Sequence, residues 1–154
     1  MNDPEKLEER LQTLEDTFAL HNLLTEYGFA ADRGDAESLL SMFTADAVYE
    51  LDELRIEGRD EIVATIIGQR DNPMMVASAH TIGPVVISVQ GDRATARGYS
   101  RLYVLEDDDR VTLWRLSFNR WDFSRQEGSW RIKRRVTRAL GREEATSLLR
   151  GGKP

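Results

Sequence analysis

The chain of 154 residues has a formal net charge of −6 at neutral pH, with 40% hydrophobic and 31% charged residues. This composition is ordinary for a soluble globular domain with its own core, and the negative balance argues against nucleic acid or an anionic membrane as a partner. The chain has no cysteine, which excludes disulfides, thiolate nucleophiles and cysteine-ligated metals.

The N-terminal third of the sequence predicts a long amphipathic helix. Its first residues, MNDPEKLEERLQ, contain no apolar signal-peptide segment, and no window approaches the ~18 apolar residues of a membrane span, so we expect a cytoplasmic protein. Asp3 before Pro4 is a helix-start signal, and Gly34 suits the left-handed conformation that ends a helix. The apolar stripe changes face near Asp16, where we expect a break, with Asp16 capping the second piece. The stripe consists of Leu7, Leu11, Leu14, Phe18, Leu20, Leu23, Leu24, Tyr27 and Ala31.

Further helices and then strands follow in chain order. Asp35 can cap a short helix ending near Phe43, and residues 59 to 70 predict a third helix. A short strand is expected over residues 47 to 56, and the period of strands then dominates. The four long strands are expected at residues 84–89, 94–105, 111–123 and 130–140, with a hairpin turn at 90–92 and a solvated tip at 106–109.

This order of elements indicates one α+β domain over residues 1–154. Helices that precede an antiparallel meander pack on one face of a curved sheet, and the space between them is a natural small-molecule site. We expect the core of the domain at about residues 14–138, with an N-terminal helical extension over 1–13 and a loose tail over 141–154.

Histidine chemistry has two candidates. His21 lies off the apolar stripe and should be exposed, whereas His80 lies in MMVASAHTIGP at the start of the sheet. Asp32 flanks the stripe, where its side chain can turn into a cavity. Taken singly, His80 is also explained as a satisfied strand-end histidine and Asp32 as a solvated last-turn residue. Together, a carboxylate would fix the tautomer of the imidazole, raise its basicity and leave the other nitrogen free to take a proton.

Several other residues are candidates for contact with a substrate. Tyr27, five residues before Asp32, can donate to a carbonyl or leaving oxygen, although packing explains it as well. Arg101 and Tyr103 share a strand face with Arg97 and Tyr99, which is either an anion-binding wall or an outward, wet face. The expected substrate-binding residues are Tyr49, Tyr103, Arg101, Phe43, Met75, Trp114 and Phe118, with Phe29, Met74 and Val76 as further apolar candidates.

Three stretches resemble a known family. The run LLTEYGFAADRGDAESLLSMFTADAVYE, the helix start GRDEI and the ending GSWRIKRR are similar to a SnoaL-like domain of the nuclear transport factor 2-like superfamily, over about residues 14 to 138. The resemblance implies a cone-shaped α+β fold, but the superfamily includes enzymes, binding modules and assembly subunits. The sharper resemblance is to scytalone dehydratase, bile-acid dehydratase and hexachlorocyclohexane dehydrochlorinase, which use an Asp–His pair. Asp32 and His80 fall where that pattern places them.

The same resemblance extends to Tyr27 and Arg135. Tyr27 matches a polar residue before the aspartate, and Arg135 matches an arginine on the last strand. Strict alternation from Trp130 and Ile132 would turn Arg135 to the other face, so we expect either a bulge or a cavity on that face. Two departures are the lack of a second pocket histidine, as in scytalone dehydratase, and Tyr103 where the bile-acid enzyme has an acidic residue.

The sequence therefore predicts a lyase-like enzyme of the dehydratase type that needs no cofactor and no metal. His80 would remove a proton from carbon of an apolar cyclic or aromatic substrate while Asp32 holds its ring. An isomerase or a cyclase begins with the same step, and a non-catalytic binding or assembly module would have no reason to keep the pair in contact. The resemblance also implies a homo-oligomer, a dimer or trimer, with Leu7, Leu11 and Leu14 packing across the interface.

Overall fold

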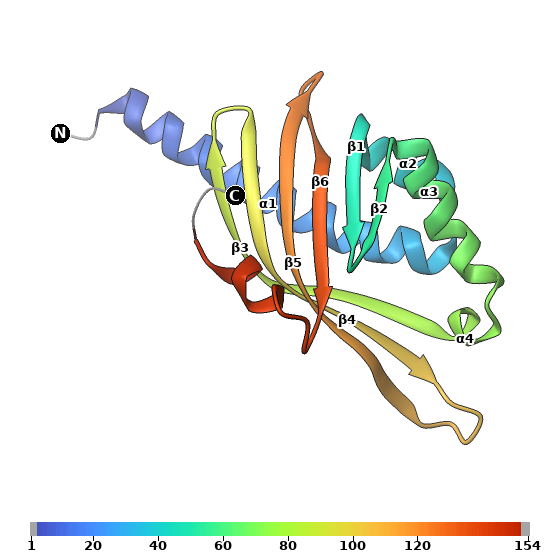
Figure 1. Ribbon diagram of the computed structural model, residues 1–154. Coiled ribbons are helices and arrows are strands. Elements are labelled where there is room, and N and C mark those ends of the chain that lie inside the picture. Colours follow the sequence, from blue (N-terminus) through green and yellow to red (C-terminus); the bar gives the residue numbers. More distant parts are fainter. Residues whose placement is uncertain (1–2, 152–154) are drawn as a thin grey trace.

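The computed structural model describes residues 3–151, which form a curved sheet crossed by a long helix (Figure 1). The helical elements are α1 (Pro4–Arg33), α2 (Ala36–Met42), α3 (Arg59–Gly68), the 3-10 turn η1 (Gln69–Asp71), α4 (Pro73–Val76) and the 3-10 turn η2 (Ala145–Leu149). The strands are β1 (Phe43–Leu51), β2 (Leu54–Glu57), β3 (Ser78–Gln90), β4 (Arg93–Leu105), β5 (Val111–Gln126) and β6 (Ser129–Ala139). They form one sheet in the order β2-β1-β6-β5-β4-β3. The pair β1 and β6 is parallel and the other pairs are antiparallel, which confirms the predicted α+β class.

The four long predicted strands are present, with two changes in the first half of the sheet. β3 begins at Ser78, ahead of the predicted start, so His80 lies within the strand and pairs with Leu102. The single strand expected over residues 47 to 56 is a hairpin of β1 and β2 that turns at Asp52, whose φ of 50° is left-handed. The segment predicted as a loose tail, residues 141–154, contains the short 3-10 turn η2. Its last residues, 152–154, lie outside the described part of the chain.

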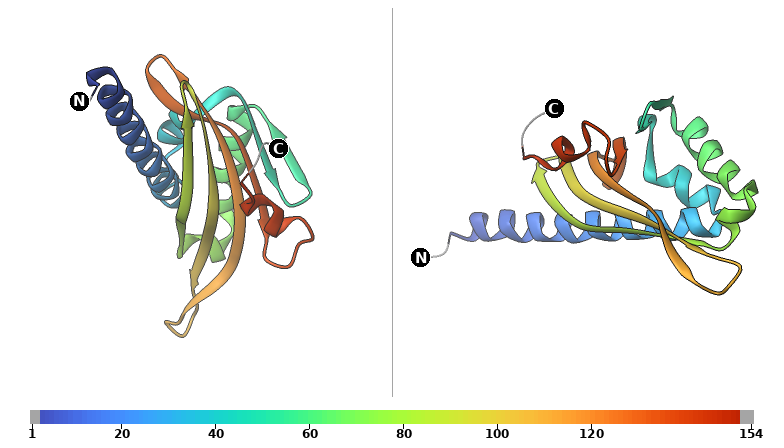
Figure 2. Two further views of the ribbon diagram at one scale, coloured as in Figure 1. Left: turned by 90° about the vertical axis from the view of Figure 1, so that its left-hand side faces the viewer. Right: turned by 60° about the horizontal axis from the view of Figure 1, so that its bottom comes forward.

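The break predicted at Asp16 is wrong, because α1 is one continuous helix that starts at the Asp3 cap and ends at Gly34, whose φ is 68°. Asp16 is buried and accepts hydrogen bonds from Trp130 Nε1 at 3.0 Å and from Arg125 at 2.7 Å. The apolar stripe changes face there because the helix leaves the sheet, not because it bends. Figure 2 shows the N-terminal turns of α1 extending past the strands.

The core lies between the helices and the inner face of the sheet. Its buried side chains come from α1, α2, α3 and the strands β1, β4, β5 and β6, and those with no exposed surface include Leu20, Leu39, Phe43, Ile62, Trp121 and Ile132. α1 runs along one face of the sheet, and η2 lies against the other (Figures 1 and 2). Among residues 3–151, no helix is long and apolar enough to cross a membrane.

Candidate functional site

A cavity of about 370 Å³ opens between the C-terminal part of α1, the segment from α3 to α4 and the sheet. Cavities of this size bury most of the surface of a small organic ligand. Its apolar lining includes Leu51, Ile66, Met74, Met75, Leu102 and Trp114. Polar side chains from α1, η1 and the strands β1, β3, β4, β5 and β6 complete the wall, so the cavity has both apolar and polar lining groups.

Asp32 at the end of α1 and His80 near the start of β3 meet at the wall of this cavity, although 48 residues separate them in sequence. The His80 ring nitrogen Nδ1 lies 2.6 Å from Asp32 Oδ1. The backbone N–H of His80 also donates to the same carboxylate, at 3.1 Å to Oδ1 and 2.9 Å to Oδ2. Since a carboxylate only accepts, Nδ1 carries the proton. Nε2 has no partner among the described residues and is free to act as a base.

Gly28 permits the close approach of α1 to β3, and Arg70 holds the C-terminal end of α1 against η1. Gly28 lies one turn before Asp32, and a Cβ atom added there would come within 3.3 Å of the carbonyl oxygen of His80. Arg70, from η1, donates a hydrogen bond to the backbone carbonyl of Asp32. Gly28 is thus a functional position that the sequence interpretation missed, and its signal was a glycine inside an otherwise regular helix.

Arg135 lies on the inner face of β6, because a bulge resolves the conflict with strict alternation. Ile132 pairs with Phe123 and Arg134 pairs with Asp122, so Lys133 is the extra residue and Arg135 returns to the face of Ile132. Of the two predicted alternatives, the bulge is the one that the structure has. Arg135 is buried and lines the cavity.

The guanidinium of Arg135 organises a buried polar cluster. Its Nη1 donates to Tyr27 Oη at 2.8 Å, while Nε and Nη2 donate to Asn119 Oδ1 at 3.2 and 2.9 Å. The cation also packs over the rings of Tyr27, Tyr49 and Trp121, at 5.1, 5.1 and 5.5 Å from their centroids. The cluster is therefore rigid, with each group held from several sides.

Burial sets the ionisation of this cluster. It raises the pKa of Tyr27 to about 12, against the opposing effect of Arg135, so the phenol keeps its proton at neutral pH. Because Tyr27 Oη accepts from Arg135, its hydrogen is available to donate, and no described residue accepts it. Burial would lower the pKa of Arg135, but the oxygens of Tyr49 and Tyr27 raise it overall, and the guanidinium stays charged.

The predicted substrate-binding residues divide into two groups. Tyr49, Arg101, Met75 and Trp114 line the cavity, as does Met74. Phe43, Phe118 and Tyr103 do not, and their prediction as wall residues is wrong for this cavity. Phe43 is fully buried and packs edge-on against Tyr27 at 5.9 Å, and Phe118 packs against Tyr99 at 5.3 Å. Tyr103 lies between Leu102 and Val104, which are both buried, so alternation turns it to the outer face of β4.

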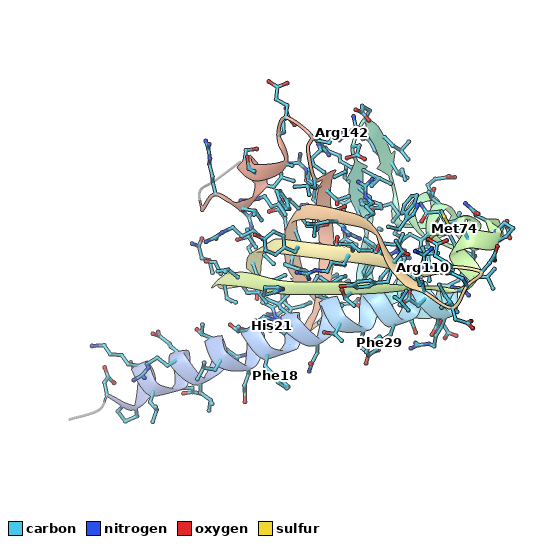
Figure 3. All side chains as sticks on the ribbon, turned by 90° about the horizontal axis from the view of Figure 1, so that it is seen from below. Phe18, His21, Phe29, Met74, Arg110 and Arg142 are labelled. Carbon is cyan, nitrogen blue, oxygen red and sulfur yellow. The ribbon has the colours of Figure 1, made fainter. Side chains whose placement is uncertain are left out.

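The remaining side chains singled out in the sequence lie away from the cavity. His21 is exposed, as predicted. Phe29 and Val76 are exposed and do not line the cavity. Figure 3 shows Phe18 and Phe29 on the side of α1 that is turned away from the sheet.

Asn119 and Thr137 are among the polar residues of the site that the sequence interpretation missed. Asn119 is fully buried on β5 and anchors Arg135, and it also donates to Ser100 Oγ at 2.9 Å. Thr137 lines the cavity with only 1% of its surface exposed, and its hydroxyl has no hydrogen-bond partner. Their signal was polarity at strand positions that share a face with Trp121 and with Arg135, respectively.

The chain belongs to the SnoaL-like domain family, because the sequence pattern of that family matches residues 12–136. An NTF2-like protein with a cystatin-like fold from Novosphingobium aromaticivorans is 37% identical to it, over 97% of this chain and 99% of that one, with a TM-score of 0.90. No functionally curated protein matches the chain.

More distant structures share the fold. A proposed scytalone dehydratase from Novosphingobium aromaticivorans is 18% identical, over 82% of this chain and 85% of that one, with a TM-score of 0.67. A type 2 hexachlorocyclohexane dehydrochlorinase (LinA) is 15% identical, over 85% of this chain and 89% of that one, with a TM-score of 0.72. At these identities the likeness extends to the fold alone.

Proposed function

We propose that the chain is a cofactor-independent lyase of the dehydratase type that removes a proton from a carbon atom of a ring-containing substrate. The observation that carries the proposal is the 2.6 Å contact between His80 Nδ1 and Asp32 Oδ1 at the wall of a cavity, with Nε2 of the ring left free. Hydrogen-bond reach between a base and the group that orients it is the first requirement of general-base catalysis. The likeness to the dehydrochlorinase and to the proposed scytalone dehydratase supports an elimination.

The reaction would begin at a carbon beside a carbonyl group. His80 Nε2 takes the proton, the electron pair of the C–H bond moves toward the carbonyl oxygen, and Asp32 stabilises the imidazolium. Tyr27 donates its hydrogen to the developing oxyanion, and the Arg135 cation behind it makes the phenol a stronger donor. The enolate then expels a hydroxyl from the next carbon, and the imidazolium returns its proton so that water leaves.

Magnitudes divide the work between these groups. A positioned general base contributes about 10²–10⁴-fold to a rate. One preorganised donor to an oxyanion contributes about 10²–10³-fold. The apolar wall must supply most of the remainder by holding the ring so that its C–H bond points at Nε2.

Two other functions remain alternatives. An isomerase or cyclase shares the first step and differs only in where the proton returns or which bond then forms. A non-catalytic binding or assembly module needs the cavity but not the contact between Asp32 and His80. The hydrogen bonds that Asp32 accepts from both the backbone and the ring of His80 therefore favour an enzyme over a non-catalytic module.

The test is an elimination assay with a panel of cyclic β-hydroxy ketones, each with and without a carboxylate on the ring. The reaction is followed by the absorbance of the conjugated enone and by deuterium exchange from D₂O into carbon. We expect His80→Ala to fall to the uncatalysed rate and Asp32→Asn to lose about 10²–10⁴-fold, because the base then lacks its orienting charge. His21→Ala, the exposed histidine, is the matched control and should retain full activity.

The outcomes separate the alternatives. Exchange without elimination would favour the isomerase or cyclase. Full activity in His80→Ala or Asp32→Asn would remove the mechanism, as would the absence of both exchange and elimination across the panel.

A further inference from the structure

The wall of the cavity contains a buried positive charge without an acidic partner. Only 6% of Arg135 is exposed, and its three hydrogen bonds go to the neutral side chains of Tyr27 and Asn119. No carboxylate of residues 3–151 lies within the 4.0 Å of an ion pair with it. A buried charge is costly to fold unless something pairs with it, so the position points to an anion that arrives from outside.

Unused donors surround this charge. A guanidinium has five N–H groups, and Arg135 uses three of them, which leaves one N–H on each of its two Nη atoms without an acceptor among the described residues. Thr137 follows two residues later on the same strand and lines the same cavity, and its buried hydroxyl has no hydrogen-bond partner. Both positions are at least nine-tenths buried, so solvent does not explain their spare donors.

The net charge of the side chains around the cavity is positive, as is that of Arg135. Four arginines line the cavity, but Arg101 shares the outer strand face of Tyr103 and donates to the Gly83 carbonyl at 2.6 Å, so Arg70, Arg115 and Arg135 supply the cations. Asp32 is the one acidic lining residue in the described part of the chain. Asp52 neutralises Arg115 at 2.9 Å, and Asp32 keeps its negative charge beside the neutral His80, so Arg70 and Arg135 leave the cavity an excess of one positive charge. The cavity is thus positive within a chain of net charge −6, and such a local field attracts anions.

We propose that the substrate of this site is an anion, a small cyclic or aromatic molecule whose carboxylate is held by the spare N–H groups of Arg135 and by the Thr137 hydroxyl. The inference rests on the proposed function only for the step at His80. Planar, bidentate recognition of a carboxylate is what a guanidinium does best. The proposal narrows the expected apolar cyclic or aromatic substrate to one whose ring carries a single negative charge.

The spacing of the site suits such a molecule. Tyr27, the partner of Arg135, and Asp32, the partner of His80, are five residues apart on α1, which is about 7.5 Å along a helix axis. This rise is a separation along the backbone, and it places the Arg135 cluster and the Asp32–His80 pair at different positions along the cavity wall. The charged group would therefore bind at one end of the ring while the base faces the other end.

Binding of 2-naphthoate and of its neutral isostere 2-naphthamide, measured by isothermal titration calorimetry, tests the proposal without turnover. In the wild type we expect the carboxylate to bind at least tenfold more tightly than the amide. Arg135→Met should abolish this preference, and Thr137→Val should reduce it about threefold to tenfold. Arg110→Gln, which removes an exposed arginine at the β4–β5 tip, is the control for non-specific charge and should leave the preference unchanged.

The proposal is overturned if the amide binds the wild type as tightly as the carboxylate, if neither binds at millimolar concentration, or if Arg135→Met keeps the preference. Should Arg135→Met fail to fold by circular dichroism, Thr137→Val decides, because the lost hydroxyl makes no bond in the protein. A preference for carboxylate without turnover would refute the reaction alone. Turnover of neutral ketones without that preference would refute the anion site alone.

Discussion

At the scale of single residues, Asp32 holds His80 at two points, the backbone N–H and the ring. The backbone bonds fix the start of β3 against the end of α1, and the ring bond fixes rotation of the imidazole. A histidine ring that rotated freely would abstract protons more slowly, because many of its orientations would be unproductive. The bonds of Asp32 to the backbone and to the ring therefore position His80 as a base. Taken singly, Asp32 and His80 could each be explained as residues with a purely structural role. Only the contact between them distinguishes a catalytic role from a structural one.

This arrangement predicts one tautomer of His80 that can be measured without a substrate. ¹⁵N-resolved NMR should show Nδ1 protonated and Nε2 unprotonated, with a ring N–H proton shifted downfield by the short bond to Asp32. In Asp32→Asn the side-chain amide can donate to Nδ1, so the proton should move to Nε2 and the downfield signal should disappear. His21→Ala should leave the spectrum of His80 unchanged. The same tautomer in Asp32→Asn and in the wild type would contradict the assigned role.

At the scale of elements, α1 is joined to the far end of the sheet by one buried carboxylate. Asp16 accepts from Trp130 at the start of β6 and from Arg125 near the end of β5, so it ties the helix to the β5–β6 hairpin. The pKa of Asp16 lies below its ordinary value of 3.8, chiefly because of the hydrogen bond from Arg125, with that from Trp130 adding to it and burial opposing it. The ionised form is therefore the one that the folded state favours.

Asp16→Ala should lower the free energy of unfolding by about 3 kcal/mol at neutral pH, because it leaves the buried Trp130 N–H and the Arg125 charge without their partner. Since the folded pKa is depressed, this stabilisation is present above the unfolded pKa and is lost as the pH falls below 3.8 and through the lowered value. Urea unfolding at pH 7 and at pH 3 should therefore show a smaller gap between wild type and variant at the lower pH.

Asp92→Asn provides the matched control, because Asp92 also contacts Arg125, at 3.0 Å, but is mostly exposed. Exposed ion pairs contribute little, so this change should have a much smaller effect at either pH. Equal losses in the Asp16 and Asp92 variants, or a gap that widens in acid, would show that Asp16 does not anchor the helix.

At the scale of the whole molecule, the sequence predicted what is local and missed what depends on pairing. Helical spacing, the Asp3 and Gly34 caps and strand alternation are properties of short windows, and they placed most elements. The position of Lys133 in a bulge is set by the register of β6 against β5, which no window of β6 contains. The burial of Asp16 likewise depends on residues more than one hundred positions away.

The site divides along the same line. The resemblance to a family predicted that Asp32, His80, Tyr27 and Arg135 share one site, and all four line the cavity. Periodicity alone could not have made that prediction. Asn119, which holds Arg135, and Thr137 were missed because a buried asparagine or threonine on a strand has no distinctive spacing. The aromatic Phe118 was predicted as a wall residue from its type, yet burial against Tyr99 decides its place.

The N-terminal turns of α1 leave an apolar stripe without a partner in the molecule. Leu7, Leu11, Leu14 and Phe18 are 54, 55, 66 and 68% exposed. The three leucines belong to the turns before Asp16, which extend beyond the sheet (Figure 2), and Phe18 lies on the side of α1 turned away from the sheet (Figure 3). Fully burying one such side chain is worth about 1.5–3 kcal/mol. Four from each of two copies would be of the same order as the roughly 4–15 kcal/mol cost of association. We therefore expect a homo-oligomer, a dimer or trimer, in which this stripe packs against another copy of the chain.

Sedimentation velocity at micromolar concentration should show particles larger than 17.6 kDa for the wild type. Leu14→Glu would place a charge in the stripe that we expect to be buried between copies of the chain. It should shift the particles to monomers, because an unpaired buried carboxylate is costly. Leu54→Glu introduces the same charge at an exposed leucine on β2, away from the stripe (Figure 1), and should leave the assembly intact. A monomeric wild type would remove the expectation, and an unchanged oligomer in Leu14→Glu would place the interface on another face of the molecule.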